Sequence, residues 1–174
     1  MNRWTWAVAV VLILCVPFSC AWAAEKGPQV GDKVIDFTLK SVDGTEVKTA
    51  DVRKDSVFLL KFGATWCGWC NKEAPHLIAV NKDYAGKVVV LDVDVKEPAE
   101  KVVAHNKTLG TTYTTLLDPK GEVAASYGVS GIPVVIIADK EGTILYRGYY
   151  TKLEDLKKVI DGALKEKPKA EPAK

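Results

Sequence analysis

Apolar runs and helical patterns alternate along the chain. The strands expected from the apolar runs are residues 35–40, 45–49, 57–62, 87–95, 114–117, 134–138 and 143–150. The expected helices are residues 71–84, 97–109, 122–127 and 152–165. The first two and the last two strands flank turn residues and predict β-hairpins. Strands that alternate with helices in this order predict an α/β fold.

The first 24 residues have the composition of an export signal. Arg3 is followed by an uncharged, largely apolar segment, residues 4–24, which contains the small-residue cleavage pattern Ala21-Trp22-Ala23. We expect residues 1–23 to be a signal peptide. The alternatives are a membrane anchor formed by residues 4–24, which are almost long enough to span a bilayer, and lipidation at Cys20. All three place the folded domain outside the cytoplasm, in the periplasm or an equivalent compartment.

The rest of the chain predicts one domain, residues 27–165, and a disordered charged tail, residues 166–174. The net charge is only +2, and no basic stripe with interleaved aromatic residues indicates nucleic-acid binding. Two of the four cysteines lie in the export segment, which leaves Cys67 and Cys70 to the domain. A disulfide between residues this close in sequence constrains the unfolded chain little, so the pair favours reactivity over stabilisation.

The motif Trp66-Cys67-Gly68-Trp69-Cys70 lies between an expected strand and an expected helix. Two cysteines three positions apart in this setting predict the redox pair of a thioredoxin-like βαβ unit. A thiolate at a helix N-terminus is stabilised by the helix macrodipole and by free N–H groups, which lowers its pKa. We therefore expect Cys67 to be the attacking nucleophile and Cys70 to resolve the mixed disulfide.

The chain resembles the thioredoxin superfamily, and within it the exported TlpA/ResA-type thiol-disulfide oxidoreductases. The residues that carry the resemblance are Asp36-Phe37-Thr38-Leu39 with Asp43-Gly44, residues 62–70, Glu73-Ala74-Pro75, Tyr127-Gly128-Val129, Gly131-Ile132-Pro133 and residues 139–142. The resemblance implies a three-layer α/β/α fold with a central mixed sheet, an N-terminal β-hairpin and an inserted helix–strand element at 97–114. It also implies a redox disulfide between Cys67 and Cys70, and no cofactor is expected.

The resemblance further implies a docking wall for a substrate polypeptide. It implies that Pro133 follows a cis peptide bond and lies against the cysteines, and that Ile132 offers backbone groups to the substrate. The position of Pro133 alone would favour an ordinary proline at the start of a strand. Trp66 is expected to pack beside the cysteines, and Trp69 to present a partly exposed contact surface to a protein partner.

Lys61 departs from the pattern of cytoplasmic thioredoxins, which have a buried, proton-relaying aspartate six residues before the first cysteine. Because an unpaired buried ammonium is costly, one expectation is that Lys61 extends to solvent at the end of its strand. The other is an ion pair between Lys61 and Glu73. In that pair the lysine would favour the Cys67 thiolate and the carboxylate would accept the Cys70 proton.

These observations predict an exported enzyme that exchanges disulfides with the thiols or disulfides of other exported proteins. By resemblance, apocytochrome c is one candidate substrate, and a membrane thiol-disulfide transporter is the expected electron donor. The direction, reducing or oxidising, is left open.

Three other functions are considered. A peroxiredoxin-like thiol peroxidase is suggested by the hairpin and by residues 62–66, but Ala64 occupies the position of the peroxidase threonine. A non-catalytic binding module would retain the fold without using the cysteines. A zinc site would need His76 and His105 as further ligands, and their spacing is unlike that of metal sites, so no metal is expected.

Overall fold

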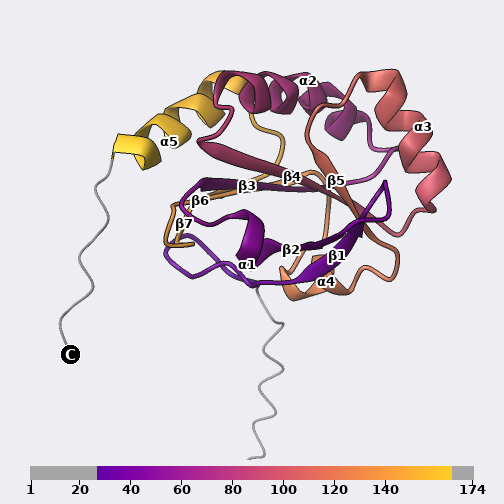
Figure 1. The fold of residues 1–174 in the computed structure, drawn as a ribbon, viewed down its shortest axis with the longest axis horizontal. Coiled ribbons are helices and arrows are strands. Elements are labelled where there is room, and N and C mark those ends of the chain that lie inside the picture. The colour runs from indigo at the N-terminus through magenta and orange to yellow at the C-terminus, as the bar shows by residue number, and fades with distance from the viewer. Residues whose placement is uncertain (1–26, 166–174) are drawn as a thin grey trace, which may run out of the picture.

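The apolar runs become the strands of one mixed sheet (Figure 1). Within residues 27–165, the part of the chain that the computed structural model describes, seven strands have the order β2-β1-β5-β4-β3-β6-β7. The strands are β1 (Thr38–Ser41), β2 (Glu46–Lys48), β3 (Val57–Gly63), β4 (Val88–Val95), β5 (Thr114–Asp118), β6 (Val134–Ala138) and β7 (Ile144–Gly148). The helices are α1 (Thr49–Val52), α2 (Gly68–Asp83), α3 (Ala99–Leu109), α4 (Glu122–Ser126) and α5 (Leu153–Lys165).

The expectations for residues 1–23 and 166–174 lie outside the described residues. Inside them, the predicted order of elements is confirmed, with two differences. Helix α1 was not expected, because a single turn of four residues gives no periodic signal. Helix α2 begins at Gly68, three residues before the helical pattern of residues 71–84, and Cys67 is its N-cap, in agreement with the helix N-terminus expected at this cysteine. None of the helices described between residues 27 and 165 is long and apolar enough to cross a membrane.

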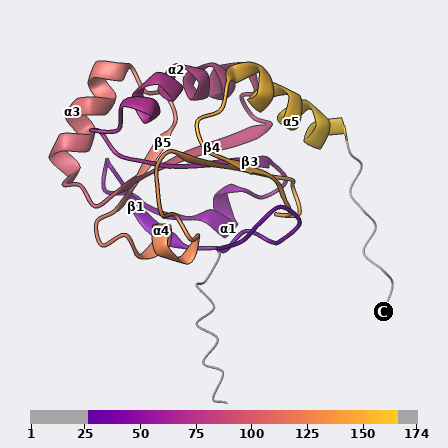
Figure 2. The same cartoon turned by 180° about the vertical axis from the view of Figure 1, so that it is seen from behind.

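Strand β3 separates two apolar cores. All seven of its residues are buried, and alternate side chains point to opposite faces of the sheet. Phe58 and Leu60 pack in the core that includes Tyr127, beside α4. Val57 and Leu59 pack in the core under α2 and α5. Figures 1 and 2 show the resulting layers, with α2, α3 and α5 over one face of the sheet and α1 and α4 over the other.

The strand directions bring three loops to one edge of the sheet. Strands β3 and β4 are parallel, so both end at this edge, whereas β6 is antiparallel to β3 and begins there. The loop after β3 carries the cysteines, the loop after β4 carries Glu97, and the loop before β6 carries Pro133. The expected insertion consists of α3 and β5, and β5 links β4 to the N-terminal hairpin.

Candidate active site

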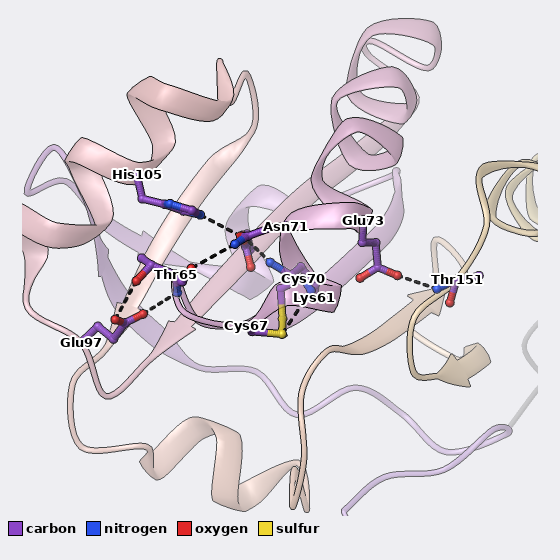
Figure 3. The surroundings of a disulfide bond; sticks show 10 residues. Lys61, Thr65, Cys67, Cys70, Asn71, Glu73, Glu97, His105 and Thr151 are labelled. Atoms are coloured by element: carbon purple, nitrogen blue, oxygen red, sulfur yellow. Dashed lines mark hydrogen bonds and ion pairs between the residues drawn. A yellow bond between two sulfur atoms is a disulfide. The ribbon is translucent and has the colours of Figure 1, made fainter.

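A disulfide joins Cys67 and Cys70 at the start of α2 (Figure 3). Cys67 is the N-cap residue, and its Sγ accepts a hydrogen bond of 3.1 Å from the N–H of Cys70. The macrodipole and the free N–H groups of the first helical turn therefore favour negative charge at Cys67, as in a thiolate after reduction. Both side chains are buried, and Cys67 is the slightly more exposed of the two, at 6% against 2%.

Lys61 is buried beneath these cysteines, and both expectations for it are wrong. The side chain does not reach solvent, because Lys61 is only 4% exposed. Its Nζ donates a hydrogen bond of 2.9 Å to Oδ2 of Asp92, so its ion-pair partner is Asp92 and not Glu73. The cause is the parallel register of β3 and β4, which places Lys61 directly beside Asp92. Residues paired in register point to the same face of the sheet and are close enough to interact.

Gly63 leaves the space in which Lys61 approaches the disulfide. A Cβ atom at Gly63 would lie 2.6 Å from the Nζ of Lys61 and 3.3 Å from the Sγ of Cys70. Both atoms therefore border the same small volume. The positive charge of the site is next to Cys70, the inner sulfur of the pair.

Glu73 lies on α2 one turn after Cys70 and is fully buried. Its Oε1 accepts a hydrogen bond of 2.6 Å from the N–H of Thr151 (Figure 3), and its Oε2 has no hydrogen-bond partner among the described residues. Burial raises the pKa of Glu73 to about 7, against the opposing effects of the Thr151 hydrogen bond and the charge of Lys61. A carboxyl with this pKa can accept or release a proton near neutral pH.

Two more buried carboxyl groups, Asp94 and Glu97, were missed by the sequence reasoning. Glu97 accepts hydrogen bonds from the N–H of Thr65 at 2.5 Å and from its hydroxyl at 2.8 Å, and it pairs with Lys101. Asp94 lines a small polar cavity together with Cys70. Burial, then the negative charge of Glu97, raises the pKa of Asp94 to about 8. The sequence did carry a signal for them, because acidic residues interrupt the apolar strand β4 near its C-terminal end, where functional side chains of α/β sheets commonly lie.

Helix α3 contacts the cysteine-bearing helix through Asn71 (Figure 3). The Nδ2 of Asn71 donates to the backbone oxygen of Thr65 at 3.2 Å, and its Oδ1 accepts from Nε2 of His105 at 2.8 Å. His105, considered above as a zinc ligand, thus takes part in helix packing. Within the described residues, no group of three or more His, Cys, Asp or Glu side chains is placed to hold a metal ion.

The four residues expected at the docking wall have different environments. The peptide bond between Ile132 and Pro133 is cis, as the resemblance implied. Pro133 is buried and Ile132 is half-buried. Trp69 is 57% exposed, in line with a contact surface. Trp66 is 69% exposed, so most of its surface faces solvent.

The AhpC/TSA family model matches residues 30–147, which is more than half of the chain. The chain belongs to the AhpC/TSA family. Thioredoxin-like protein YneN of Bacillus subtilis is 34% identical over 161 residues, which cover 86% of this chain and 93% of that protein. Thiol-disulfide oxidoreductase ResA of Geobacillus thermodenitrificans is 33% identical over 135 residues, 76% of each chain.

Solved structures agree with this family. A Chlorobium tepidum crystal structure assigned as thiol:disulfide interchange protein DsbE is 30% identical, with a TM-score of 0.72 over 78% of this chain and 98% of that one. A Bacteroides thetaiotaomicron structure described as a protein disulfide isomerase is 32% identical, with a TM-score of 0.70 over 79% and 91%. The thioredoxin-like α/β fold is confirmed. With the Cys67–Cys70 disulfide, these relatives show that this AhpC/TSA member is a thiol-disulfide oxidoreductase of the ResA and DsbE type.

Removing one partner of the buried ion pair should destabilise the protein more than removing both. Asp92→Leu leaves the ammonium of Lys61 buried without a counter-charge, which typically costs about 3–5 kcal/mol. Lys61→Met/Asp92→Leu replaces both charges by apolar side chains and should recover most of that loss. Urea unfolding of the oxidised protein measures both. The exposed pair of Lys54 and Asp51, replaced in the same way, is the control and should change little. Equal losses in the single and double variants would contradict the expectation.

The raised pKa of Glu73 predicts that stability depends on pH. The unfolded glutamate releases its proton near 4.5, whereas folded Glu73 releases it near 7. Its contribution to stability is therefore fully present below pH 4.5 and is lost as the pH rises through 7. The free energy of unfolding of the oxidised wild type should fall in that window relative to Glu73→Gln, which stays neutral. A constant difference between the two proteins would show that burial does not raise this pKa.

Proposed function

We propose that this protein is an exported enzyme that exchanges disulfides with other exported proteins through Cys67 and Cys70. The observation that carries the proposal is the disulfide at the N-cap of α2, where the helix stabilises a thiolate at Cys67. The signal-like pattern of residues 1–23 supports export. The similarity to ResA of Geobacillus thermodenitrificans supports the reaction class.

The reducing direction has two steps. The Cys67 thiolate attacks a substrate disulfide, so a bond forms between Cys67 and one substrate sulfur while the substrate S–S bond breaks. The released substrate thiolate takes a proton from solvent. The Cys70 thiolate then attacks Cys67 Sγ, which forms the Cys67–Cys70 disulfide and releases the second substrate sulfur as a thiolate, which is protonated in turn. Two electrons pass from the enzyme to the substrate, and the reverse sequence oxidises a substrate dithiol.

Lys61 and Glu73 are proposed to control the proton of Cys70. The Nζ of Lys61 borders the same space as the Sγ of Cys70, so its positive charge favours the Cys70 thiolate. Glu73 follows Cys70 by one turn, and its Oε2 has no hydrogen-bond partner among the described residues, so this oxygen is available to accept the thiol proton. This proposal keeps the role expected for Glu73, but it moves the effect of Lys61 from the Cys67 thiolate to the Cys70 thiolate. Asp92 rather than Glu73 neutralises the lysine.

The substrate polypeptide is proposed to cross the cis peptide bond of Ile132 and Pro133 and to contact Trp66 and Trp69. The cis bond and the exposure of the two indoles support this placement. By resemblance to TlpA/ResA-type enzymes, apocytochrome c is the candidate substrate. A membrane thiol-disulfide transporter would then return the enzyme to its dithiol form.

A peroxiredoxin-like thiol peroxidase is the alternative function, because the chain matches the AhpC/TSA family model. Ala64 in place of the peroxidase threonine speaks against it, as does the disulfide partner three residues away. A low-pKa thiolate can still react with peroxide slowly.

Replacing single cysteines tests the reaction. Cys67→Ser should abolish the reduction of insulin in the presence of dithiothreitol, because the attacking thiolate is lost. Cys70→Ser should retain the attack and accumulate a mixed disulfide with a substrate protein, detectable on a non-reducing gel. Undiminished insulin reduction by Cys67→Ser would contradict the proposal. Faster turnover of hydrogen peroxide than of insulin by the wild type would favour the peroxidase.

Replacing the buried ion pair tests the role of Lys61. In reduced Lys61→Met/Asp92→Leu, the pKa of Cys70 should be about one unit or more above its wild-type value, because the adjacent cation is gone. The pH dependence of Cys70 alkylation, followed by mass spectrometry of its peptide, measures this pKa. The matched control replaces Lys54 and Asp51 in the same way and should leave it unchanged. If the pKa of Cys70 is unmoved, Lys61 has only a structural role.

A further inference from the structure

One face of α2 holds the loop between β7 and α5. Trp69, Glu73 and His76 follow one another at helical spacing, so their side chains share this face. The Oε1 of Glu73 accepts the N–H of Thr151 at 2.6 Å, and the Nδ1 of His76 donates to the backbone oxygen of Thr151 at 3.1 Å. Both backbone polar groups of Thr151 are therefore bound by side chains of the helix that carries the cysteines.

The preceding residue extends this contact to the molecular surface. The ring centroid of Tyr150 lies 5.1 Å from that of Trp69 and 5.9 Å from that of His76. Next to it, Tyr149 is 66% exposed, and Trp69 itself is 57% exposed. An aromatic pair that reaches the surface, as Trp69 and Tyr150 do, is typical of interaction sites, and the neighbouring Tyr149 adds exposed aromatic area.

The chemistry of the enzyme determines what covers this surface. Exchange requires a covalent bond between Cys67 and a substrate cysteine, so the residues beside that cysteine must lie against the residues beside Cys67. Trp69 is two residues from Cys67, and Tyr150 contacts Trp69. An extended polypeptide advances about 3.3 Å per residue, so side chains about two to four positions from its cysteine can reach these rings.

We propose that Trp69, Tyr149 and Tyr150 form an aromatic surface that recognises an apolar side chain near the reacting cysteine of a polypeptide. The occupant is an extended segment with an aromatic or large aliphatic residue about two to four positions from its cysteine. The inference rests on the proposed function, because it requires Cys67 to react with polypeptides. Glu73 and His76 are positioning residues for this surface, since they bind Thr151 and are not exposed themselves.

An apolar partner fits this surface better than a charged one. The carboxylate on this face of α2, that of Glu73, is buried and bonded to backbone, so it is not presented to a ligand. One cation, Lys72, already lies over the Trp69 ring, with its Nζ 4.4 Å from the centroid. Trp69 and Tyr149 nevertheless remain 57% and 66% exposed. Aromatic rings offer apolar area with few side-chain torsions to immobilise.

Three disulfide substrates test the proposal on the full-length protein. The first is a mixed-disulfide peptide with Phe three residues from its cysteine, the second has Ser in place of that Phe, and the third is the small disulfide cystamine. The wild type should prefer the Phe peptide to the Ser peptide by roughly tenfold in kcat/KM. Tyr149→Ala/Tyr150→Ala should lose that preference and should keep its activity on cystamine within about twofold.

Three variants control for folding and for the ring itself. Tyr150→Phe should keep the preference because it keeps the ring, and Tyr149→Ala should weaken it without disturbing the packed Tyr150. Tyr84→Ala, at the far end of α2, should leave the preference unchanged. Equal kcat/KM values of the wild type for the Phe and Ser peptides would overturn the inference. A loss of kcat/KM in Tyr149→Ala that is the same for both peptides and for cystamine would also overturn it. If the wild type fails on every substrate including cystamine, the proposed function itself is wrong.

Discussion

A lysine buried in the strand that leads to the cysteines determines how this site is built. The ammonium of Lys61 needs a counter-charge inside the sheet, and the parallel register with β4 provides it as Asp92. It also needs space near the helix, which the missing Cβ of Gly63 leaves. The same space is bordered by Cys70 Sγ, so the arrangement that makes a buried charge tolerable also places that charge beside the reactive sulfur.

The ionisable groups around Cys70 consequently differ in their charge and in their pKa values. Lys61 and Asp92 form an ion pair, and its cationic end, the Nζ of Lys61, borders the same space as Cys70 Sγ. Glu73 and Asp94 have pKa values raised by burial to about 7 and about 8, so each holds its proton over part of the neutral range. Disulfide reduction adds two electrons and creates groups that bind protons. Carboxyls that titrate near neutral pH can supply or receive those protons without water entering the core.

Local sequence features predicted the elements and the redox pair, but not the partners of the buried charges. The apolar runs and the turn residues located β3, and the spacing of Cys67 and Cys70 identified the motif. The partner of Lys61 depends on the register between β3 and β4, which are distant in sequence, so no local pattern indicates it. The cis peptide bond before Pro133 was predicted from the family resemblance alone. The position of this proline just before a strand would by itself predict an ordinary strand-start proline.

The contacts of Thr65 and Thr151 could not be predicted from the sequence for a different reason. Glu97 and Glu73 bind backbone N–H groups of these residues, and every residue except proline has such a group, so composition gives no sign of the pairing. These two contacts hold the segment that carries the cysteines from opposite sides, one from the loop after β4 and one from the loop before α5 (Figure 3). The sulfur chemistry is thereby fixed by buried groups, while Trp69 remains exposed.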